Sequence, residues 1–493
     1  EPHVSRGGPW GAIFHGPAFP CLFVPRRAGW NWQRPARRVI MRKTQNAAQA
    51  VKGGPFMLAN EVLSFIEEND VKFVKLMFCD IFGSLKTISV IAGELPKIFR
   101  EGLIFDASKL GGFLNVTASD LRLFPDPDTL ALLPWRPQHG RVVRFFCHLK
   151  YPDGTAFEGD GRFFLKTAIA YAKGKGYNFQ IGTSCEFYCF EKDDTDMPTK
   201  RPHDYAGYCD AAPVDRGENL RRDICLTLEQ MDIFPESSRH ETGPGQNEID
   251  FQYSNALKAA DNLVTFKNVV KSVADRNGLY ATFMPKPIVD NCGSGLHIML
   301  MCMKGTENVF KPQLGGLSKE AERMIAGILK NVGDMTLFLN TTTNSYKRFG
   351  SLLAPKYISW SHENYAQLLR APLADTDENG IILRSADNTC NPYFAMGLLI
   401  YACIDGVINK EELPKPFNFN IGSADESELA KLETLPQSLK EAVERAEKSE
   451  FLADRLPEHM LERFIAIEKE LIIEYERAAD KEQFETARYF YHL

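Results

Sequence analysis

The sequence Met284-Pro285-Lys286-Pro287, followed by Asn291-Cys292-Gly293-Ser294-Gly295-Leu296-His297, decides the fold of this chain. It is a glycine-containing loop that leads into an apolar segment carrying one histidine. By itself, a histidine in an apolar segment is more often a hydrogen-bonded core residue than a metal ligand. The residues that accompany His297 elsewhere in the chain therefore decide how it is interpreted.

Three glutamates lie in strand-like segments elsewhere in the chain. Glu186 lies between Cys185 and Phe187 in a strand-like segment over residues 180–190, which predicts that its side chain points toward a cavity or an ion. Glu241 and Glu248 bracket residues 242–247, whose glycines allow the backbone to approach a ligand closely. Glutamates that converge in a pocket are the ligands that Mg²⁺ or Mn²⁺ prefers. The alternative is that each one is an ordinary strand glutamate facing solvent.

The composition is that of a globular protein. A chain of 493 residues is expected to form two domains. Its net charge of −6 argues against a general nucleic-acid binder. No apolar run reaches the ~18 residues of a membrane span, and residues 394–403 predict a buried helix instead. Eleven cysteines without CxxC pairs suit reduced thiols in a cytoplasmic protein.

The first 56 residues differ in composition from the rest. Between Pro2 and Asn60 there is no Asp or Glu, while arginine, proline, glycine and tryptophan are frequent. A mitochondrial presequence is also rich in arginine, but it is rich in serine as well, and this stretch contains only Ser5. Residues 1–56 are therefore expected to be a disordered extension.

Strand signals dominate the next hundred residues. Residues 58–69 predict an amphipathic helix, and residues 71–78 and 87–91 predict two strands. The segment Asp80-Ile81-Phe82-Gly83-Ser84-Leu85-Lys86 is expected to join them as a hairpin. This pattern predicts a small, strand-rich first domain over residues 57–155.

Helices and strands then mix without regular βαβ spacing. The predicted elements are a helix over 162–175, a strand over 177–191, a helix over 262–277, a strand over 279–285, and charged helices over 435–479. Such a mixture favours an α+β class for a larger second domain over residues 156–493.

The ordered motifs resemble those of glutamine synthetase, in its bacterial type I form. The matching segments, from about Val71 to Gly406, are Gly245–Phe251 (a metal-ligand strand), Met284–Pro287 with Gly293–His297 (the ATP-binding signature), Asn344–Arg348 (the glutamate-binding loop), Ala354-Pro355, Trp360-Ser361, Arg370–Pro372, Arg384, Asp387, Asn391–Tyr393 and Asp405–Val407.

The resemblance implies an N-terminal β-grasp domain and a catalytic domain with a curved antiparallel sheet. It implies a homo-oligomer of two stacked six-membered rings, with active sites between neighbouring subunits. The implied reaction uses ATP and Mg²⁺ or Mn²⁺ to phosphorylate the γ-carboxylate of glutamate, after which ammonia displaces phosphate.

Many functional positions of the family keep their residue types. The resemblance assigns the metal ligands to Glu186, Glu241, Glu248 and His297. It assigns the ammonium site to Asp80, supplied by a neighbouring subunit. Glutamate contacts fall on Gly293, Arg348 and Arg384, and a nucleotide contact falls on Arg370.

Other functional positions are changed. The replaced positions are Ser184 and Ile382 for two glutamates of the ATP-bound cation, Met299 for a histidine, Gly380 and Tyr365 for two arginines, Leu353 for the flap glutamate, and Cys292 for an asparagine. Loss of one arginine that stabilises a transferring phosphoryl group costs on the order of 10³ in rate. Three interpretations stay open: an active glutamine synthetase, a binding or regulatory homologue without ATP chemistry, and a ligase that makes γ-glutamyl amides.

Overall fold

The computed structural model describes residues 59–116, 119–136, 139–314, 316–351, 353–374, 376–418, 424 and 426–493. Residues 56–493 make up one compact unit. The disorder expected for residues 1–56 lies outside the described residues. None of the described helices is long and apolar enough to cross a membrane. The ten cysteines of the described part are free thiols, as their spacing predicts.

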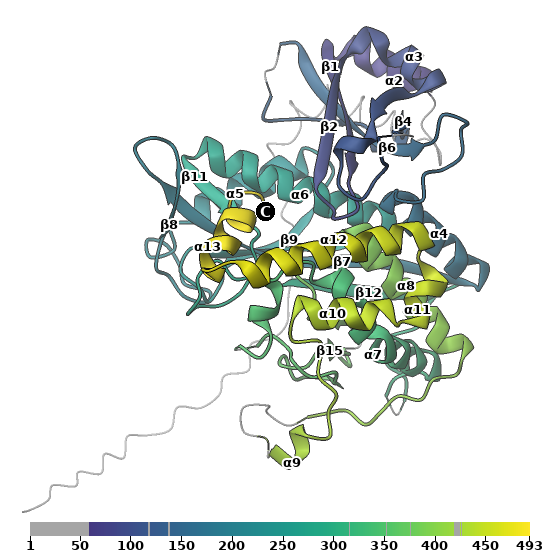
Figure 1. Ribbon diagram of the computed structural model, residues 1–493, viewed down its shortest axis with the longest axis vertical. Coiled ribbons are helices and arrows are strands. Elements are labelled where there is room, and N and C mark those ends of the chain that lie inside the picture. Colours follow the sequence, from purple (N-terminus) through teal and green to yellow (C-terminus); the bar gives the residue numbers. More distant parts are fainter. Residues whose placement is uncertain are drawn as a thin grey trace, which may run out of the picture. The chain divides into compact units, whose positions relative to one another are not determined.

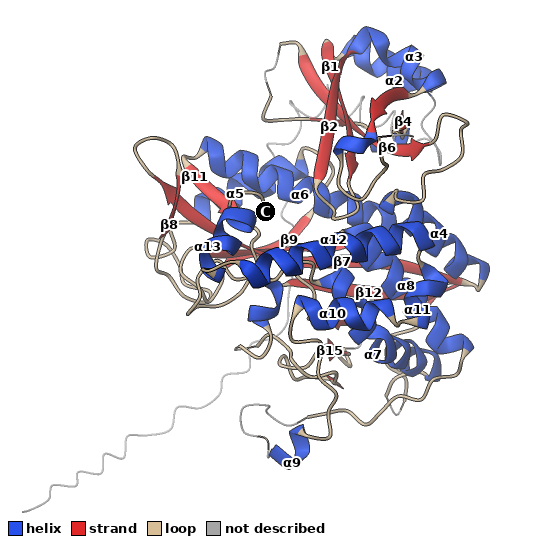
Figure 2. Cartoon of the chain, in the orientation of Figure 1, coloured by secondary structure: helices blue, strands red, loops and turns tan. Residues whose placement is uncertain are grey.

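The first part of the described chain is a six-stranded sheet with helices beside it (Figures 1 and 2). Strands β1 and β2 form the predicted hairpin, and β1 also pairs in parallel with β6. The elements are α2 (Ala59–Glu68), β1 (Val71–Cys79), β2 (Leu85–Ile91), η1 (Ala92–Glu94), α3 (Leu95–Glu101), β3 (Leu103–Asp106), η2 (Ala107–Lys109), β4 (Asp120–Pro125), η3 (Pro127–Thr129), β5 (Ala131–Leu132) and β6 (Arg141–Lys150).

A ten-stranded sheet forms the floor of the second part. Its main path runs β14-β15-β16-β12-β7-β10-β9, and every pair in it is antiparallel except β14 with β15. The strands are β7 (Tyr177–Lys192), β8 (Pro198–Pro202), β9 (Pro235–His240), β10 (Gln246–Asn255), β11 (Leu279–Thr282), β12 (Leu296–Lys304), β13 (Glu307–Asn308), β14 (Trp360–Ser361), β15 (Leu369–Arg370) and β16 (Ile381–Leu383). The predicted α+β class is confirmed.

Helices cover this sheet, and their ends follow capping residues in the sequence. They are α4 (Gly161–Gly174), α5 (Glu218–Glu229), α6 (Ala256–Arg276), α7 (Lys319–Leu339), η4 (Ser345–Arg348), α8 (Pro392–Ile408), α9 (Glu426–Leu429), α10 (Leu439–Glu447), α11 (Glu450–Arg455), α12 (Glu458–Arg477), α13 (Lys481–Glu485) and η6 (Thr486–Phe490). Helix α6 begins earlier than predicted because the Asn255 side chain accepts a hydrogen bond from the Lys258 amide. The charged helices predicted over 435–479 are separate elements, because Ser449 caps α11 and Pro457 precedes α12.

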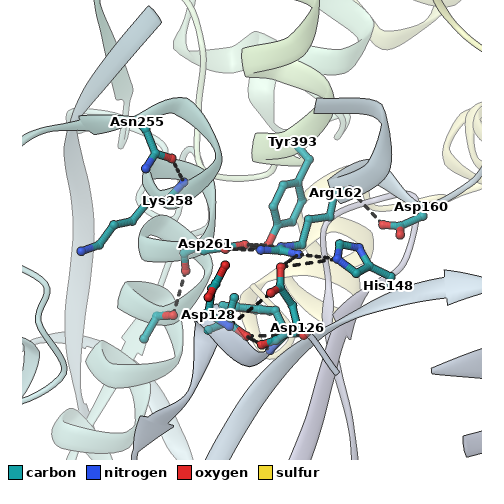
Figure 3. A network of polar contacts seen from close by, with 12 residues as sticks. Asp126, Asp128, His148, Asp160, Arg162, Asn255, Lys258, Asp261 and Tyr393 are labelled. Carbon is teal, nitrogen blue, oxygen red and sulfur yellow. Dashed lines mark hydrogen bonds and ion pairs between the residues drawn. The ribbon is translucent and has the colours of Figure 1, made fainter. Parts of the chain in front are cut away.

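A buried arginine ties the two parts together (Figure 3). Arg162, in the first turn of α4, donates from Nη1 to Asp126 Oδ2 at 2.7 Å and from Nε to Asp261 Oδ1 at 3.0 Å. The Tyr393 hydroxyl donates to the same Asp261 carboxylate at 2.7 Å. Asp126 follows β4, while the other three residues belong to α4, α6 and α8. The contact therefore fixes the first sheet against the helices of the second part.

Candidate functional site

The candidate site consists of three cross-strand rows on one face of the large sheet. In the first row, Arg239 on β9 is opposite Glu248 on β10, and Glu248 is opposite Glu186 on β7. Residues directly opposite each other on neighbouring strands project on the same side of a sheet. Two predicted metal ligands and an arginine therefore share this face.

The second row is also polar. Asp250 on β10 is opposite Ser184 on β7, and Ser184 is opposite His297 on β12. The Ser184 hydroxyl donates to Asp250 Oδ1 at 2.5 Å and also contacts the Glu248 carboxylate. A serine at the position expected for a glutamate thus contacts two carboxylates and brings no charge of its own.

The third row is largely apolar. Gly182, Met299, Ile382 and Arg370 follow one another across β7, β12, β16 and β15. The methyl end of Met299 lies 3.0 Å from the place where a β-carbon on Gly182 would be. Of the four residues, only Arg370 has a polar side chain, so this part of the face offers phosphate little to bind.

A glycine loop and Arg348 complete the site beside the first row. The Gly295 amide donates to Glu186 Oε2 at 2.8 Å. A β-carbon on Gly295 would lie 2.8 Å from Arg348 Nη2 and 3.6 Å from His297 Nε2, and one on Gly293 would lie 2.5 Å from Arg348 Cγ. Only glycine fits at position 293, where a β-carbon would also lie 2.8 Å from the Pro285 carbonyl oxygen, whereas at Gly295 the nearest atom is the end of the Arg348 side chain. The predicted residues Gly293, His297, Glu186 and Arg348 are therefore brought together.

The residues present fit one divalent cation. Ligand atoms of Glu186, Glu248 and His297 all lie within 4.8 Å of one another. Burial and the charge of Glu248 raise the pKa of Glu186 to about 7. Burial and the charges of Arg384 and Arg348 hold the pKa of His297 well below its usual value, so the imidazole is in the neutral form that ligates metals. Mutual repulsion of this kind is relieved when a cation binds.

Arg239 lies among these carboxylates, and sequence reasoning missed it. One guanidinium nitrogen is 2.6 Å from Glu248 Oε2, another is 2.7 Å from Asp250 Oδ2, and Nε is 3.6 Å from Glu241 Oε1. Strand alternation in the sequence could have indicated it. Arg239 lies two residues before Glu241, and side chains two residues apart in a strand project on the same face of the sheet. Glu241 lies next to this arginine and outside the three-ligand cluster.

Two arginines expected to bind ligands stack on Tyr365, at the position where a third arginine was expected. Arg370 Cζ is 4.0 Å from the centre of the Tyr365 ring, and Arg384 Cζ is 5.6 Å from it. The Tyr365 side chain is about half exposed. Cation–π contacts of this type hold both guanidinium groups beside an aromatic ring.

The backbone around Gly380 has no room for a side chain. A β-carbon there would lie 2.5 Å from the carbonyl oxygen of Leu300 and 2.6 Å from the hydroxyl of Tyr253. The space beside Gly380 is therefore filled by the carbonyl of Leu300 and the hydroxyl of Tyr253. Nothing in the sequence indicated that these groups would lie there.

Asp80 lies in the β1–β2 hairpin, on contacts of its own. Its carboxylate forms an ion pair with Lys86 at 3.1 Å and accepts hydrogen bonds from the Phe82 and Ser84 amides. Its carbonyl accepts from the Asn391 side chain at 3.1 Å. Within the part of the chain that the structure describes, none of these partners belongs to the Glu186 cluster.

Two other replaced positions have different surroundings. The Leu353 side chain is exposed. The Cys292 carbonyl accepts a hydrogen bond from the Tyr188 hydroxyl at 2.7 Å, so the loop at this position is held by its backbone.

A second cluster, formed by Asp204, Asp215 and His240, holds the loop that leads into β10. His240 Nε2 is 2.8 Å from Asp204 Oδ1, and Asp215 pairs with Arg221. The Gly245 amide also donates to Asp204, at 3.0 Å. These buried groups already satisfy one another, which makes the cluster a support for the loop between Glu241 and Glu248.

Comparison with known proteins gives consistent matches. Residues 70–152 match the family model of the glutamine synthetase beta-Grasp domain, and residues 158–489 match that of the glutamine synthetase catalytic domain. The glutamine synthetase of Clostridium saccharobutylicum is 42% identical over 411 residues, which are 82% of this chain and 93% of the relative. That of Methanosarcina mazei is 41% identical over 410 residues, 82% of this chain and 92% of the relative.

Solved structures agree. A GmaS/ADP complex has a TM-score of 0.78 at 27% identity, covering 86% of this chain and 98% of that one. A cryo-electron microscopy structure of Plasmodium falciparum glutamine synthetase has a TM-score of 0.78 at 24% identity, covering 88% and 99%, and it shows the same fold.

Proposed function

This chain belongs to the glutamine synthetase family, and we propose that it keeps the amino-acid side of the site while lacking ATP-dependent phosphoryl transfer. Its role is then that of a binding or regulatory homologue. The observation that carries this proposal is Arg239, whose guanidinium lies among Glu241, Glu248 and Asp250.

The charge of the nucleotide side supports the proposal. In the family, a cation held by a histidine and two glutamates neutralises ATP phosphates. Here Ser184 and Ile382 take the places of those glutamates and bring no charge, while His297 stays neutral. Three carboxylates nearby are instead in contact with Arg239. A second divalent cation would have to compete with a fixed guanidinium for the same oxygens.

The phosphate contacts support it as well. Met299 and Ile382 make the third row apolar, and Tyr365 occupies the place of an arginine. Phosphate oxygens brought to this surface would lose water without gaining donors, at roughly 1–3 kcal/mol for each unmade hydrogen bond and more for a charged group.

The amino-acid side is intact by comparison. Arg348, Arg384 and the Gly293–Gly295 loop surround Glu186, and the guanidinium Nε atoms of both arginines lack a partner within the described residues. An amino acid supplies a carboxylate for such donors and an ammonium group for such acceptors. Glutamate or a related amino acid is the proposed ligand.

One cation, Mg²⁺ or Mn²⁺, would be held by Glu186, Glu248 and His297, with Glu241 at the edge. When bound, it would polarise the ligand's carboxylate and offset the repulsion between the two glutamates. The protein residues orient that carboxylate and exclude water from it.

The assembly follows from the family. Glutamine synthetases form homo-oligomers, and we propose two stacked six-membered rings in which Asp80 reaches a neighbour's site. Its own contacts, to Lys86 and Asn391, hold the hairpin in place for that role. A cytoplasmic location is proposed on the same basis. Mass photometry of the full chain measures the assembly directly.

Two active ligases remain as second candidates, because the GmaS/ADP complex at 27% identity is of a protein that binds ADP. One is glutamine synthetase itself. The other is a ligase joining glutamate to a primary amine, which the loss of a glutamate at Leu353 would suit.

Phosphate release with glutamate and ATP tests these candidates. The assay is run with ammonia and then with primary amines, with the Clostridium saccharobutylicum relative as positive control. Background rates with every nucleophile are expected. Turnover of about 1–10 s⁻¹ with ammonia would overturn the proposal in favour of glutamine synthetase, and turnover with an amine alone would favour the amide ligase.

A further inference from the structure

A cavity of about 420 Å³ is lined by residues outside the Glu186 cluster, although Asn388 in its wall donates a hydrogen bond to the Glu186 carbonyl at 2.8 Å. It is bounded by the β1–β2 hairpin, the segment after β5, helix α6 and the last two residues of the chain (Figure 1). None of Glu186, Arg348 and Arg384 lines it. Its lining residues come from the part of the fold with the six-stranded sheet and from the part with the ten-stranded sheet. The shape of the cavity therefore depends on how these two parts pack together.

The cavity is lined by basic side chains and by no Asp or Glu. The basic residues are Lys75, Lys86, Arg136, Lys267 and Lys271. Lys86 is paired with Asp80 at 3.1 Å. Within the described residues, no ion pair joins any of the other four to a carboxylate.

Within the described part of the chain, two of these lysines donate hydrogen bonds to backbone carbonyls and to no side chain. Lys267 Nζ donates to the carbonyl of Asn388 at 3.0 Å, and Lys271 Nζ donates to that of His492 at 3.2 Å. Burial and repulsion from Lys267 lower the pKa of Lys271 to about 8, and burial and Arg136 lower that of Lys75. The positive charges therefore destabilise one another, and a bound anion would relieve this.

The rest of the lining suits an organic anion. Hydroxyl and amide donors come from Ser84, Thr87, Asn268 and Ser272, and an apolar wall comes from Trp135 and Leu133. The volume falls within the range of small-ligand sites, about 300–1,000 Å³.

We propose that this cavity binds a small phosphorylated metabolite, with its phosphate among Lys75, Lys267, Lys271 and Arg136 and its organic part against Trp135. Ammonium groups act as point charges that suit phosphate, whereas paired recognition of carboxylates is usually the work of arginine, of which only Arg136 lines the cavity. The ligand would also contact Lys86, which holds Asp80, so occupancy is coupled to the hairpin.

Titration of the full chain with sodium tripolyphosphate tests the site, and succinate serves as the dicarboxylate arm. Binding is followed by calorimetry and by tryptophan fluorescence. Tripolyphosphate is expected to bind more tightly than succinate, and Trp135→Phe is expected to abolish the fluorescence change. The double variant Lys75→Gln with Arg136→Gln should raise the Kd at least tenfold.

Matched controls keep the result specific. The double variant Lys166→Gln with Lys258→Gln removes the same charge from exposed positions outside the cavity and should leave the Kd unchanged. Arg384→Gln should also leave it unchanged, which separates this cavity from the amino-acid site. No binding of tripolyphosphate, or equal loss in both double variants, would overturn the proposal. Succinate binding that is tighter and equally sensitive to Lys75 and Arg136 would overturn the assignment to phosphate.

Discussion

A guanidinium nitrogen of Arg239 lies 2.6 Å from the carboxylate of Glu248, a residue expected to ligate a divalent cation. A guanidinium, whose positive charge is permanent, thus contacts a carboxylate at the proposed cation site. A cation that binds at Glu248 must displace or share this contact.

Removing Arg239 is expected to tighten divalent-cation binding. Arg239→Ala should lower the Kd for Mn²⁺ at least tenfold, about 1.4 kcal/mol, because the competing charge is lost. Calorimetry or electron paramagnetic resonance of Mn²⁺ measures it. Arg239→Lys keeps the charge and serves as the control. Equal Mn²⁺ affinity in Arg239→Ala and the parent would refute the competition.

Glu468 on α12 predicts an unusual pH dependence of stability. Its side chain is buried, one carboxyl oxygen has no hydrogen-bond partner among the described residues, and burial raises its pKa to about 8. The folded state then keeps a proton that the unfolded state loses near its ordinary pKa of about 4.5. Stability therefore falls as pH rises from about 4.5 to about 8.

Glu468→Gln should remove that loss and stabilise the protein at pH 8 by roughly 1–4 kcal/mol, at 1.36 kcal/mol per pKa unit. Melting temperatures of the variant and parent at pH 5 and pH 8 provide the measurement. Glu470→Gln, exposed on the same helix, is the control. Parallel pH profiles for parent and Glu468→Gln would count against a buried, protonated carboxyl.

Arg162 is expected to be required for folding. Arg162→Ala leaves the carboxylates of Asp126 and Asp261 without the guanidinium that pairs with both, at a cost of about 3–5 kcal/mol. Arg162→Met combined with Asp261→Asn should cost less, since a charge is removed together with its partner. Urea denaturation distinguishes the two. Arg222→Ala, in an exposed ion pair, should be nearly neutral, and a similar effect at both arginines would contradict the assignment.

Restoring an arginine at position 380 is expected to fail unless its surroundings change. Gly380→Arg alone should lower the melting temperature, because its β-carbon would meet the Tyr253 hydroxyl at 2.6 Å and the Leu300 carbonyl at 2.5 Å. Gly380→Arg with Tyr253→Ala should recover part of that loss. Thermal unfolding of the two variants decides it, and an undiminished melting temperature for the single variant would show that the strand adapts freely.

The sequence predicted the fold and much of the site because both depend on local order along the chain. The Gly293–His297 loop, the hairpin at Asp80 and the strand bearing Glu186 are contiguous signals. Asn255 capping explains why α6 begins before its predicted start: an Asn hydrogen bond overrides the apolar pattern.

The contacts around Arg239 and Gly380 depend instead on residues that come from neighbouring strands of the sheet. Arg239 is positioned by its pairing with Glu248, and the closure around Gly380 is made by Tyr253 from β10. Alternation along one strand predicts a face but not the residue opposite. Register across the sheet had to be known before either contact was apparent.

The closed space at Gly380 also limits the order in which mutations can accumulate. Any lineage, natural or in the laboratory, that acquired an arginine there would have to shorten Tyr253 and shift the backbone at Leu300, changes that by themselves add no phosphate contact. A selection for nucleotide turnover would therefore not favour the variant that carries only the first of these changes. Libraries that vary positions 253 and 380 together would reach combinations that one-step searches miss.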